Sequence, residues 1–168
     1  MYAIVFREGR KLFVNLKGEE IDMKVYVMVV SFLLAVFASS VVFAADAGSI
    51  KNIEGEAWIV RDGKQIPAKK GMRLRENDTL KTGHDGVMGV FLRDDTIISM
   101  GPNSEMVLAV FIFQPRTDEF GMFTRFLKGS FTYISGVMAR LNPESVKIET
   151  PVSMVSIRGT HFLINVKD

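Results

Sequence analysis

The chain has 168 residues and no cysteine, and its 21 lysines and arginines nearly balance its 19 aspartates and glutamates, which gives a formal net charge of +2. The missing cysteine excludes disulfides, thiolate metal sites, thiol catalysis and lipid attachment through an N-terminal cysteine. The mixed charges give no electrostatic footprint for nucleic acid, so the sequence predicts one domain of ordinary size, held together by packing, with no nucleic-acid partner.

A long apolar segment, here called the leader, lies near the N-terminus. Residues 25–45, VYVMVVSFLLAVFASSVVFAA, are interrupted only by serines, Lys24 precedes them, and Val42-Phe43-Ala44 fits a small-residue cleavage pattern. We therefore predict an N-terminal hydrophobic signal helix at residues 23–45, cleaved after Ala44, and a periplasmic or secreted product. About 20 apolar residues also span a bilayer, so an uncleaved anchor in the inner membrane is the alternative, with membrane contact through residues 25–45 only.

Residues 1–22 carry charges of both signs and do not resemble part of a signal peptide. Two interpretations stay open: translation begins at Met23, or the segment is a short cytoplasmic tail. Twenty-two residues are too few for a domain. The predicted organisation is thus an upstream extension at 1–22, a signal peptide or signal anchor at 23–45, and a single domain at 46–168.

Beyond the leader, short apolar segments alternate with turn residues, a pattern typical of an all-β domain. The expected strands lie at about residues 57–60, 65–68, 79–82, 87–92, 96–100, 105–113, 122–127, 130–134 and 146–150. Residues 136–144 fit either a short helix or an open loop. The sequence therefore predicts a fold of many short strands.

One expected strand is apolar throughout: residues 106–113 read MVLAVFIF. Alternate side chains of a strand point to opposite faces, so these residues cannot all face one core. One set needs a second cover, and the two sets are Val107, Ala109, Phe111 and Phe113, or Met106, Leu108, Val110 and Ile112. We take the first set as the candidate partner surface, and burial of both faces within the domain is the alternative.

Sites of chemistry are harder to find. His84 and His161 lack the spacing of a metal motif, and Asp94-Asp95 with Asp85 could gather around calcium, although hairpin turns favour aspartate anyway. No G-x-S-x-G elbow and no glycine-rich phosphate loop occurs. The sequence thus predicts no catalytic residue, no metal site and no cofactor, and we do not expect an enzyme.

Near the C-terminus, the apolar residues on the two sides of Arg158-Gly159-Thr160 keep opposite side-chain phases, which predicts a bulge or tight corner there. Gly159 supplies the left-handed backbone freedom that such a corner needs. We expect Gly159→Val to be far more damaging than Gly136→Val. Arg158 is either a structural cation or an exposed contact for an anion or a partner.

The pattern T-P-x-x-x-V-x-I-R-G-T-x-F at residues 150–162 resembles the C-terminal end of the FecR family domain, an extracytoplasmic β module. The motif residues are Thr150, Pro151, Arg158, Gly159, Thr160 and Phe162. Earlier segments recur in the family's order: GMRLRENDTLKT at 71–82, L-x-D-x-T at 92–96, Pro102-Asn103-Ser104 and Lys128-Gly129-Ser130-Phe131. The family usually has glycine at the position of Asp95, where we expect the same turn with slightly more strain.

The resemblance covers about residues 47–167 and implies a twisted β-solenoid-like or sandwich module in which the motif residues are structural. It further implies a non-catalytic, exported domain that binds a protein or a cell-envelope component. A membrane-anchored signal-transduction protein, like the anti-sigma regulators of the family, is the alternative, although at most 24 residues precede the apolar run here. An envelope enzyme is the second alternative. The sequence specifies neither the ligand nor the oligomeric state.

Overall fold

The computed structural model describes residues 24, 27–28, 46–156, 159 and 161–167. The chain divides into two compact units, Met1–Phe43 and Ala44–Asp168, and the architecture below is that of the second. Residues 24, 27 and 28 of the predicted leader are helical, whereas the rest of residues 1–45 lies outside the described residues. No helix within the described ranges is long and apolar enough to cross a membrane.

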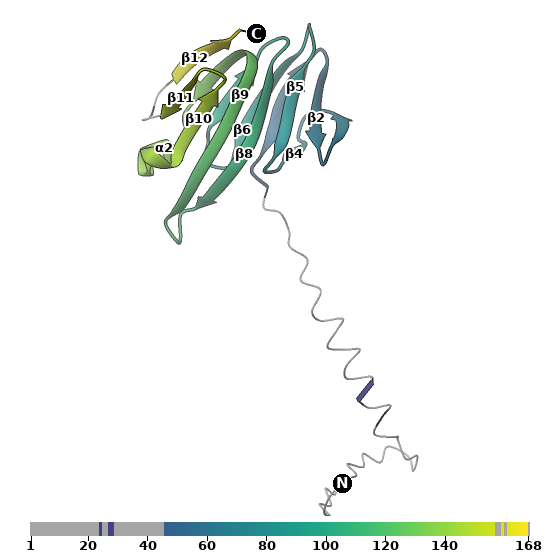
Figure 1. Ribbon diagram of the computed structural model, residues 1–168, viewed down its shortest axis with the longest axis vertical. Coiled ribbons are helices and arrows are strands. Elements are labelled where there is room, and N and C mark those ends of the chain that lie inside the picture. Colours follow the sequence, from purple (N-terminus) through teal and green to yellow (C-terminus); the bar gives the residue numbers. More distant parts are fainter. Residues whose placement is uncertain (1–23, 25–26, 29–45, 157–158, 160, 168) are drawn as a thin grey trace, which may run out of the picture. The chain divides into compact units, whose positions relative to one another are not determined.

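The domain is one curled sheet of 12 strands (Figure 1). One side, here called the first half, contains in spatial order β3 (Lys64–Pro67), β2 (Ala57–Arg61), β5 (Asp78–Thr82) and β8 (Glu105–Gln114). The other side, the second half, contains β7 (Ile97–Met100), β6 (Val87–Leu92), β1 (Gly48–Glu54) and β4 (Arg73–Leu74). The long strand β9 (Glu119–Ile134) lies between β8 and β7 and therefore belongs to both halves.

Each part of β9 has a partner on both of its edges. Its N-terminal part pairs with β8 and, in parallel, with β10 (Val146–Thr150). Its C-terminal part pairs antiparallel with β7 and with β12 (His161–Val166). The remaining strand, β11 (Ser153–Ser156), pairs with β10, and the helix α2 (Met138–Leu141) and the turn η1 (Pro143–Ser145) connect β9 to β10.

The sheet bends where the two halves meet. Gly129 has a φ of +94°, and a side chain at this position would meet Ser104 in the segment that links β7 to β8. The Ser104 hydroxyl accepts a hydrogen bond from the Ser130 N–H (3.1 Å) and donates to the Ser130 carbonyl (3.2 Å). The Ser104 N–H donates to the Thr82 hydroxyl (2.9 Å). Buried hydroxyls thus fix the bend at which β9 passes from one half to the other.

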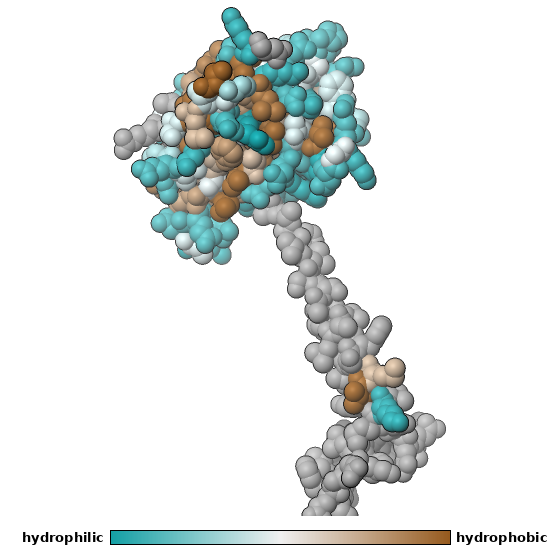
Figure 2. Space-filling model, in the orientation of Figure 1, coloured by the Kyte–Doolittle hydropathy of each residue, from teal (hydrophilic) through white to brown (hydrophobic). Residues whose placement is uncertain are grey.

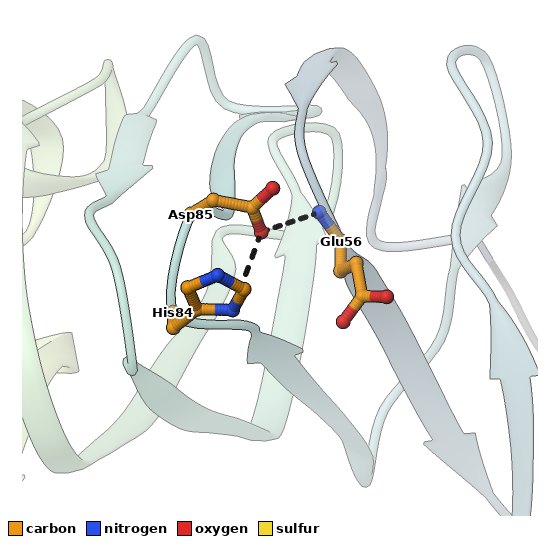
Figure 3. Close-up of side chains that lie close together, drawn as sticks. All are labelled: Glu56, His84 and Asp85. Atoms are coloured by element: carbon orange, nitrogen blue, oxygen red, sulfur yellow. Dashed lines mark hydrogen bonds and ion pairs between the residues drawn. The ribbon is translucent and has the colours of Figure 1, made fainter.

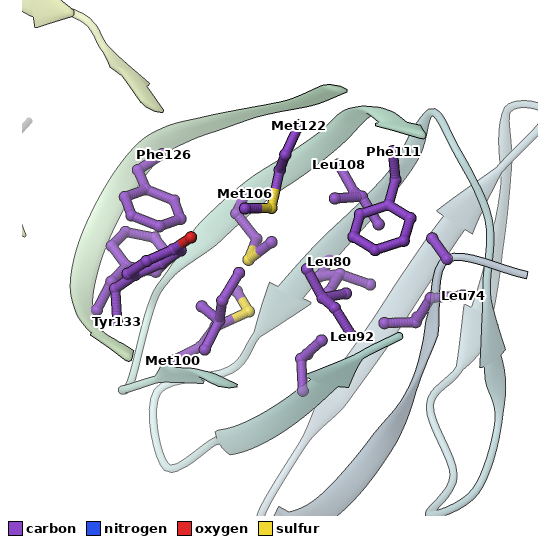
Figure 4. Packing of buried hydrophobic residues seen from close by; sticks show 14 of the residues in the cluster. Leu74, Leu80, Leu92, Met100, Met106, Leu108, Phe111, Met122, Phe126 and Tyr133 are labelled. Carbon is purple, nitrogen blue, oxygen red and sulfur yellow. The ribbon is translucent and has the colours of Figure 1, made fainter. Parts of the chain in front are cut away.

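Both halves contribute to one core, seen in Figure 4. Alternate residues of β5 and β8 in the first half and of β6 and β7 in the second half are buried together, among them Leu80, Met106, Leu92 and Met100. Phe126 and Phe131, on either side of the bend in β9, stack with ring centroids 4.1 Å apart. Burial of such side chains stabilises the fold by about 1.5–3 kcal/mol each. The two inner faces are therefore parts of a single packing unit.

The all-β prediction is confirmed, and β6 and β10 have the predicted bounds. The two halves face each other across one core, but they belong to one sheet, and among the described strands only β9 and β10 pair in parallel. Two predicted strands, at 122–127 and 130–134, are the single strand β9, because the β7–β8 segment bends beside it and pairing continues past Gly129. Residues 136–144 adopt the helical alternative.

Candidate binding site

A pocket of about 660 Å³ opens where several loops meet the end of β8. Arg61 at the end of β2 and Asp62 in the turn that follows line one side, and the segment before β5 contributes residues 75–77. Arg93, after β6, and residues 111–114 at the end of β8 complete the lining. The pocket therefore combines loops from both halves of the sheet with the strand that was expected to carry a partner surface.

Aromatic side chains form the apolar wall of this pocket. Phe111 is only 4% exposed and packs in the core cluster, while the guanidinium carbon of Arg93 lies 5.6 Å from the centroid of its ring. Phe113 packs against Phe120 of β9 with ring centroids 6.0 Å apart. A cation above an aromatic ring is attracted by about 0.5–1 kcal/mol at an exposed site. Arg93 is thus held beside the apolar wall with its charge accessible.

The three arginines of the pocket differ in their partners. Arg61 donates from Nε and from one terminal nitrogen to the two oxygens of Asp78, at 2.7 Å each, and Asp78 is 1% exposed. These hydrogen bonds raise the pKa of Arg61. Arg75 and Arg93 are exposed and have no ion-pair partner among the described residues. The pocket therefore presents two guanidinium groups that make no described ion pair, together with the carboxylates of Asp62 and Glu76. Guanidinium groups suit a carboxylate or a phosphate.

Glu76 links the pocket loop to β8. Its Oε1 accepts a hydrogen bond of 2.7 Å from the backbone N–H of Phe111. This N–H follows the place where the pairing of β8 with β9 shifts register, between Leu108 and Val110. The shift leaves Ala109 as an extra residue, so Glu76 satisfies a donor close to a β-bulge.

The bulge also changes the candidate partner surface. Val107, Ala109, Phe111 and Phe113 do not share one face of β8, which corrects the alternation expected along the whole strand. An extra residue reverses the side-chain phase, so Phe111 is buried with the core although Val107 points outward. Beyond the bulge the outward residues are Val110 and Ile112, of which Ile112 is 40% exposed. Figure 2 shows apolar side chains gathered on the domain and bordered by hydrophilic ones.

The turn between β6 and β7 explains the L-x-D-x-T pattern. Asp94 is fully buried, and its carboxylate accepts hydrogen bonds from the Thr96 hydroxyl (2.7 Å) and the Thr96 N–H (3.2 Å). Burial raises the pKa of Asp94, and the bonds from Thr96 partly offset that effect. Asp95 has a φ of +67°, the left-handed geometry expected where the family has glycine. Asp94 is thus a structural hydrogen-bond acceptor, and it does not gather with Asp85 as a calcium cluster among the described residues.

The C-terminal motif is placed in part. The Thr150 hydroxyl accepts from the Ser153 N–H (3.1 Å), Gly159 has a φ of +59°, and Phe162 stacks on Tyr133 with centroids 5.0 Å apart. Pro151 is exposed in the turn between β10 and β11. Arg158 and Thr160 lie outside the described residues. The left-handed backbone at Gly159 agrees with the expected corner between the strands.

The expected ranking of two glycine substitutions is reversed by this geometry. A side chain at Gly136 would meet the backbone of Asp94 and Thr96, whereas one at Gly159 would meet, among the described residues, Arg140 Cγ at 3.9 Å. The N–H of Gly136 also donates to the Thr96 hydroxyl (3.0 Å). Gly159→Val is strained by its positive φ alone, but Gly136→Val has no space at all. Gly136 is therefore the less tolerant position.

A second group of polar side chains lies where the β1–β2 turn meets the β5–β6 turn (Figure 3). Glu56, His84 and Asp85 place one potential ligand atom each within 4.8 Å of one another, and all three residues are exposed. Asp85 Oδ1 also accepts a hydrogen bond from the Glu56 N–H (3.3 Å). One imidazole and two carboxylates suit a divalent transition-metal ion such as zinc. The sequence patterns did not indicate this group, because the two turns are distant along the chain.

The chain was compared with protein families, curated proteins and solved structures. The family model described as FecR protein matches residues 78–168. No curated protein and no solved structure matches the chain. The matched segment contains β5 to β12. It therefore includes all of β8, the bend of β9 and the C-terminal motif.

Proposed function

This chain belongs to the FecR family, and we propose that its β domain is a non-catalytic binding module that works outside the cytoplasm. The FecR domain is related to signalling and regulation. The partner is a protein or a cell-envelope component that carries an anionic group. Export through the apolar leader at residues 23–45 places the domain in the periplasm or outside the cell.

The pocket at the end of β8 carries this proposal. Specific binding sites combine an apolar wall with a few charged groups that fix the orientation of a ligand. Here Phe111 and Phe113 supply the wall, while Arg75 and Arg93 supply charges that make no ion pair among the described residues. Glu76 and Asp62 on the same rim discriminate against a ligand that is anionic over its whole surface. A carboxylate or phosphate on an apolar or peptide body fits this arrangement.

A capture experiment tests the pocket. The tagged full-length chain and the double variant Arg75→Ala, Arg93→Ala are each produced in cells. The measurement is the amount of envelope material that each protein captures. The matched control is Arg116→Ala, Arg140→Ala, which removes two exposed arginines outside the pocket lining. We expect the pocket variant to lose at least about tenfold in affinity, which corresponds to about 1.4 kcal/mol. Equal capture by both double variants would exclude the pocket as the binding site.

The membrane-anchored, anti-sigma-like alternative differs in what residues 25–45 do. Under our proposal these residues are removed, and N-terminal analysis of the exported protein gives a chain that begins at Ala45 or close to it. A product that retains them in the membrane fraction would favour an anchored signal-transduction protein with the same outer domain. The two outcomes leave the pocket experiment unaffected, so location and binding are tested separately.

A further inference from the structure

The free edges of the sheet are not protected equally. An exposed strand edge offers unpaired N–H and C=O groups to other chains, and proteins usually blunt it with lysine, proline or short length. The edge strand β3 contains Lys64 and Pro67, and the edge strand β4 has only 2 residues, one of them Arg73. β12 has 6 residues, HFLINV, without lysine, arginine, aspartate, glutamate or proline. Only one of its edges pairs with a described strand, which is β9.

The outward face of β12 is apolar at its centre. Leu163 is 71% exposed, and its neighbours on the same face are His161 and Asn165, both exposed. The inward residues Phe162 and Ile164 pack against the core. A strand with high β-propensity, an exposed leucine and no charge has the properties of an edge that pairs with another chain. The other C-terminal edge strand, β11, has only 4 residues.

We propose that β12 pairs antiparallel with β12 of a second copy of this chain, around a twofold axis at Leu163. A twofold interface must be self-complementary, and a strand without formal charge meets its own copy without repulsion. In this register Leu163 lies opposite Leu163 of the partner subunit, and His161 lies opposite Asn165 of the partner subunit. The second half of the sheet then continues across the two copies.

The surface behind β12 supports a second copy as the occupant. Leu163 is aligned with Thr132 of β9, and Thr132 with Ser99 of β7. The next row contains His161, Ile134 and Ile97. Neither row carries a lysine, arginine, aspartate or glutamate, so these two rows meet their copies without like charges. One pair of six-residue strands buries less than the roughly 1,200 Å² of a stable interface, so the dimer is expected to be weak in dilute solution.

Disulfide trapping suits a weak dimer, and the cysteine-free chain makes it specific, because only an introduced thiol reacts. The full-length Leu163→Cys variant is produced in cells. Its thiol is oxidised in the intact cells, and the protein is then separated on a non-reducing gel. We expect a disulfide-linked dimer as the main product. Phe91→Cys and Met154→Cys are controls, since both residues are exposed apolar side chains away from the proposed axis, and they should stay monomeric.

A second pair of variants tests the register. His161 and its copy are four residues apart along the paired strands, about 13 Å, which is too far for a disulfide, and the same holds for Asn165. His161→Cys and Asn165→Cys should therefore not cross-link alone, but should do so when two differently tagged chains are produced together. A Leu163→Cys yield no higher than that of Phe91→Cys would overturn the proposal. So would cross-linking of either single variant with itself, or an adduct to a different protein in place of the dimer.

Discussion

The two halves of the sheet have similar inner faces and different outer faces. The outer face of the first half carries ion pairs between neighbouring strands, Lys81–Glu105 at 3.0 Å and Arg125–Glu149 at 3.9 Å. From β6 across to β12, the outward residues of the described second half carry no formal charge. Packing dictates what faces the core, whereas the outward residues are free to differ. The absence of charge is confined to the strands from β6 to β12, because β1 and β4 of the same half carry Lys51, Glu54 and Arg73.

A second contrast lies in the buried aspartates that hold one loop in each half. Asp78 is paired with an arginine, whereas Asp94 has no ion pair among the described residues and is held by hydrogen bonds from Thr96 and from backbone groups that include Met138. A buried ion pair loses about 3–5 kcal/mol when one partner is removed. A carboxylate without a counter-ion shifts its pKa upward, because desolvation disfavours its charge. An ion pair thus stabilises the loop of the first half, whereas hydrogen bonds from hydroxyl and amide groups stabilise the loop of the second half.

The largest effect is expected where the halves join. Gly129→Val introduces a β-branched side chain at a positive φ and against Ser104, so we expect a loss of about 4 kcal/mol or more in the free energy of unfolding. Gly121→Val is the control on the same strand, because its side chain would make ordinary contacts of 3.7 Å with Ile112. Thermal and urea unfolding measure both. Similar melting temperatures would show that the bend does not depend on Gly129.

Substitutions on the inner and outer faces of β8 should differ in their effect on stability. Phe111→Ser removes a core side chain and should cost about 3–4 kcal/mol, since large-to-small changes of phenylalanine fall in this range. Val110→Ser changes a half-buried outward residue and should cost less than about 1.5 kcal/mol. Chemical denaturation with both variants checks the bulge. If Val110→Ser were the more damaging change, the phase assigned to β8 would be wrong.

The smallest effect concerns Asp94 and depends on pH. Asp94→Asn should cost about 1–3 kcal/mol, because an amide offers one acceptor oxygen to the two donors of Thr96. The folded-state pKa of Asp94 is raised, so the stability gained by its protonation is fully present below the unfolded pKa of about 3.9 and is lost as pH rises through the folded pKa.

The free energy of unfolding of the wild type should therefore exceed that of Asp94→Asn by a growing amount as pH falls from about 7 towards 4. Urea unfolding of the two proteins at a series of pH values measures this difference. Thr96→Val, which removes one hydrogen-bond donor to Asp94, is measured in parallel. If the difference in the free energy of unfolding became smaller on acidification, the folded state would prefer ionised Asp94.

Much of the fold was accessible from local patterns. Turn residues located most strands, and the aspartate at position 95 and the glycine at 159 indicated left-handed backbone, which both residues have. The bulge at Ala109 was not predictable, because in an all-apolar run an extra residue leaves no mark on the pattern.

Two features of the candidate sites also escaped prediction, because long-range contacts decide them. Gly136 matters through Thr96, 40 residues away, and Asp85 meets Glu56 across 29 residues. The arginines that line the pocket come from the end of β2 and from two separate loops, and nothing in their local sequence distinguishes them from solvated charges.

The position of β9 also decides the order in which the chain can be completed. Residues 46–118 contain every strand from β1 to β8, but β7 and β8 each keep one edge unpaired until β9 is available. While the last third of the chain is still being synthesised, one edge of the four-residue β7 and one edge of the ten-residue β8 are therefore unpaired. Insertion of β9 between them is a late, long-range step, and such steps are slow and favour aggregation.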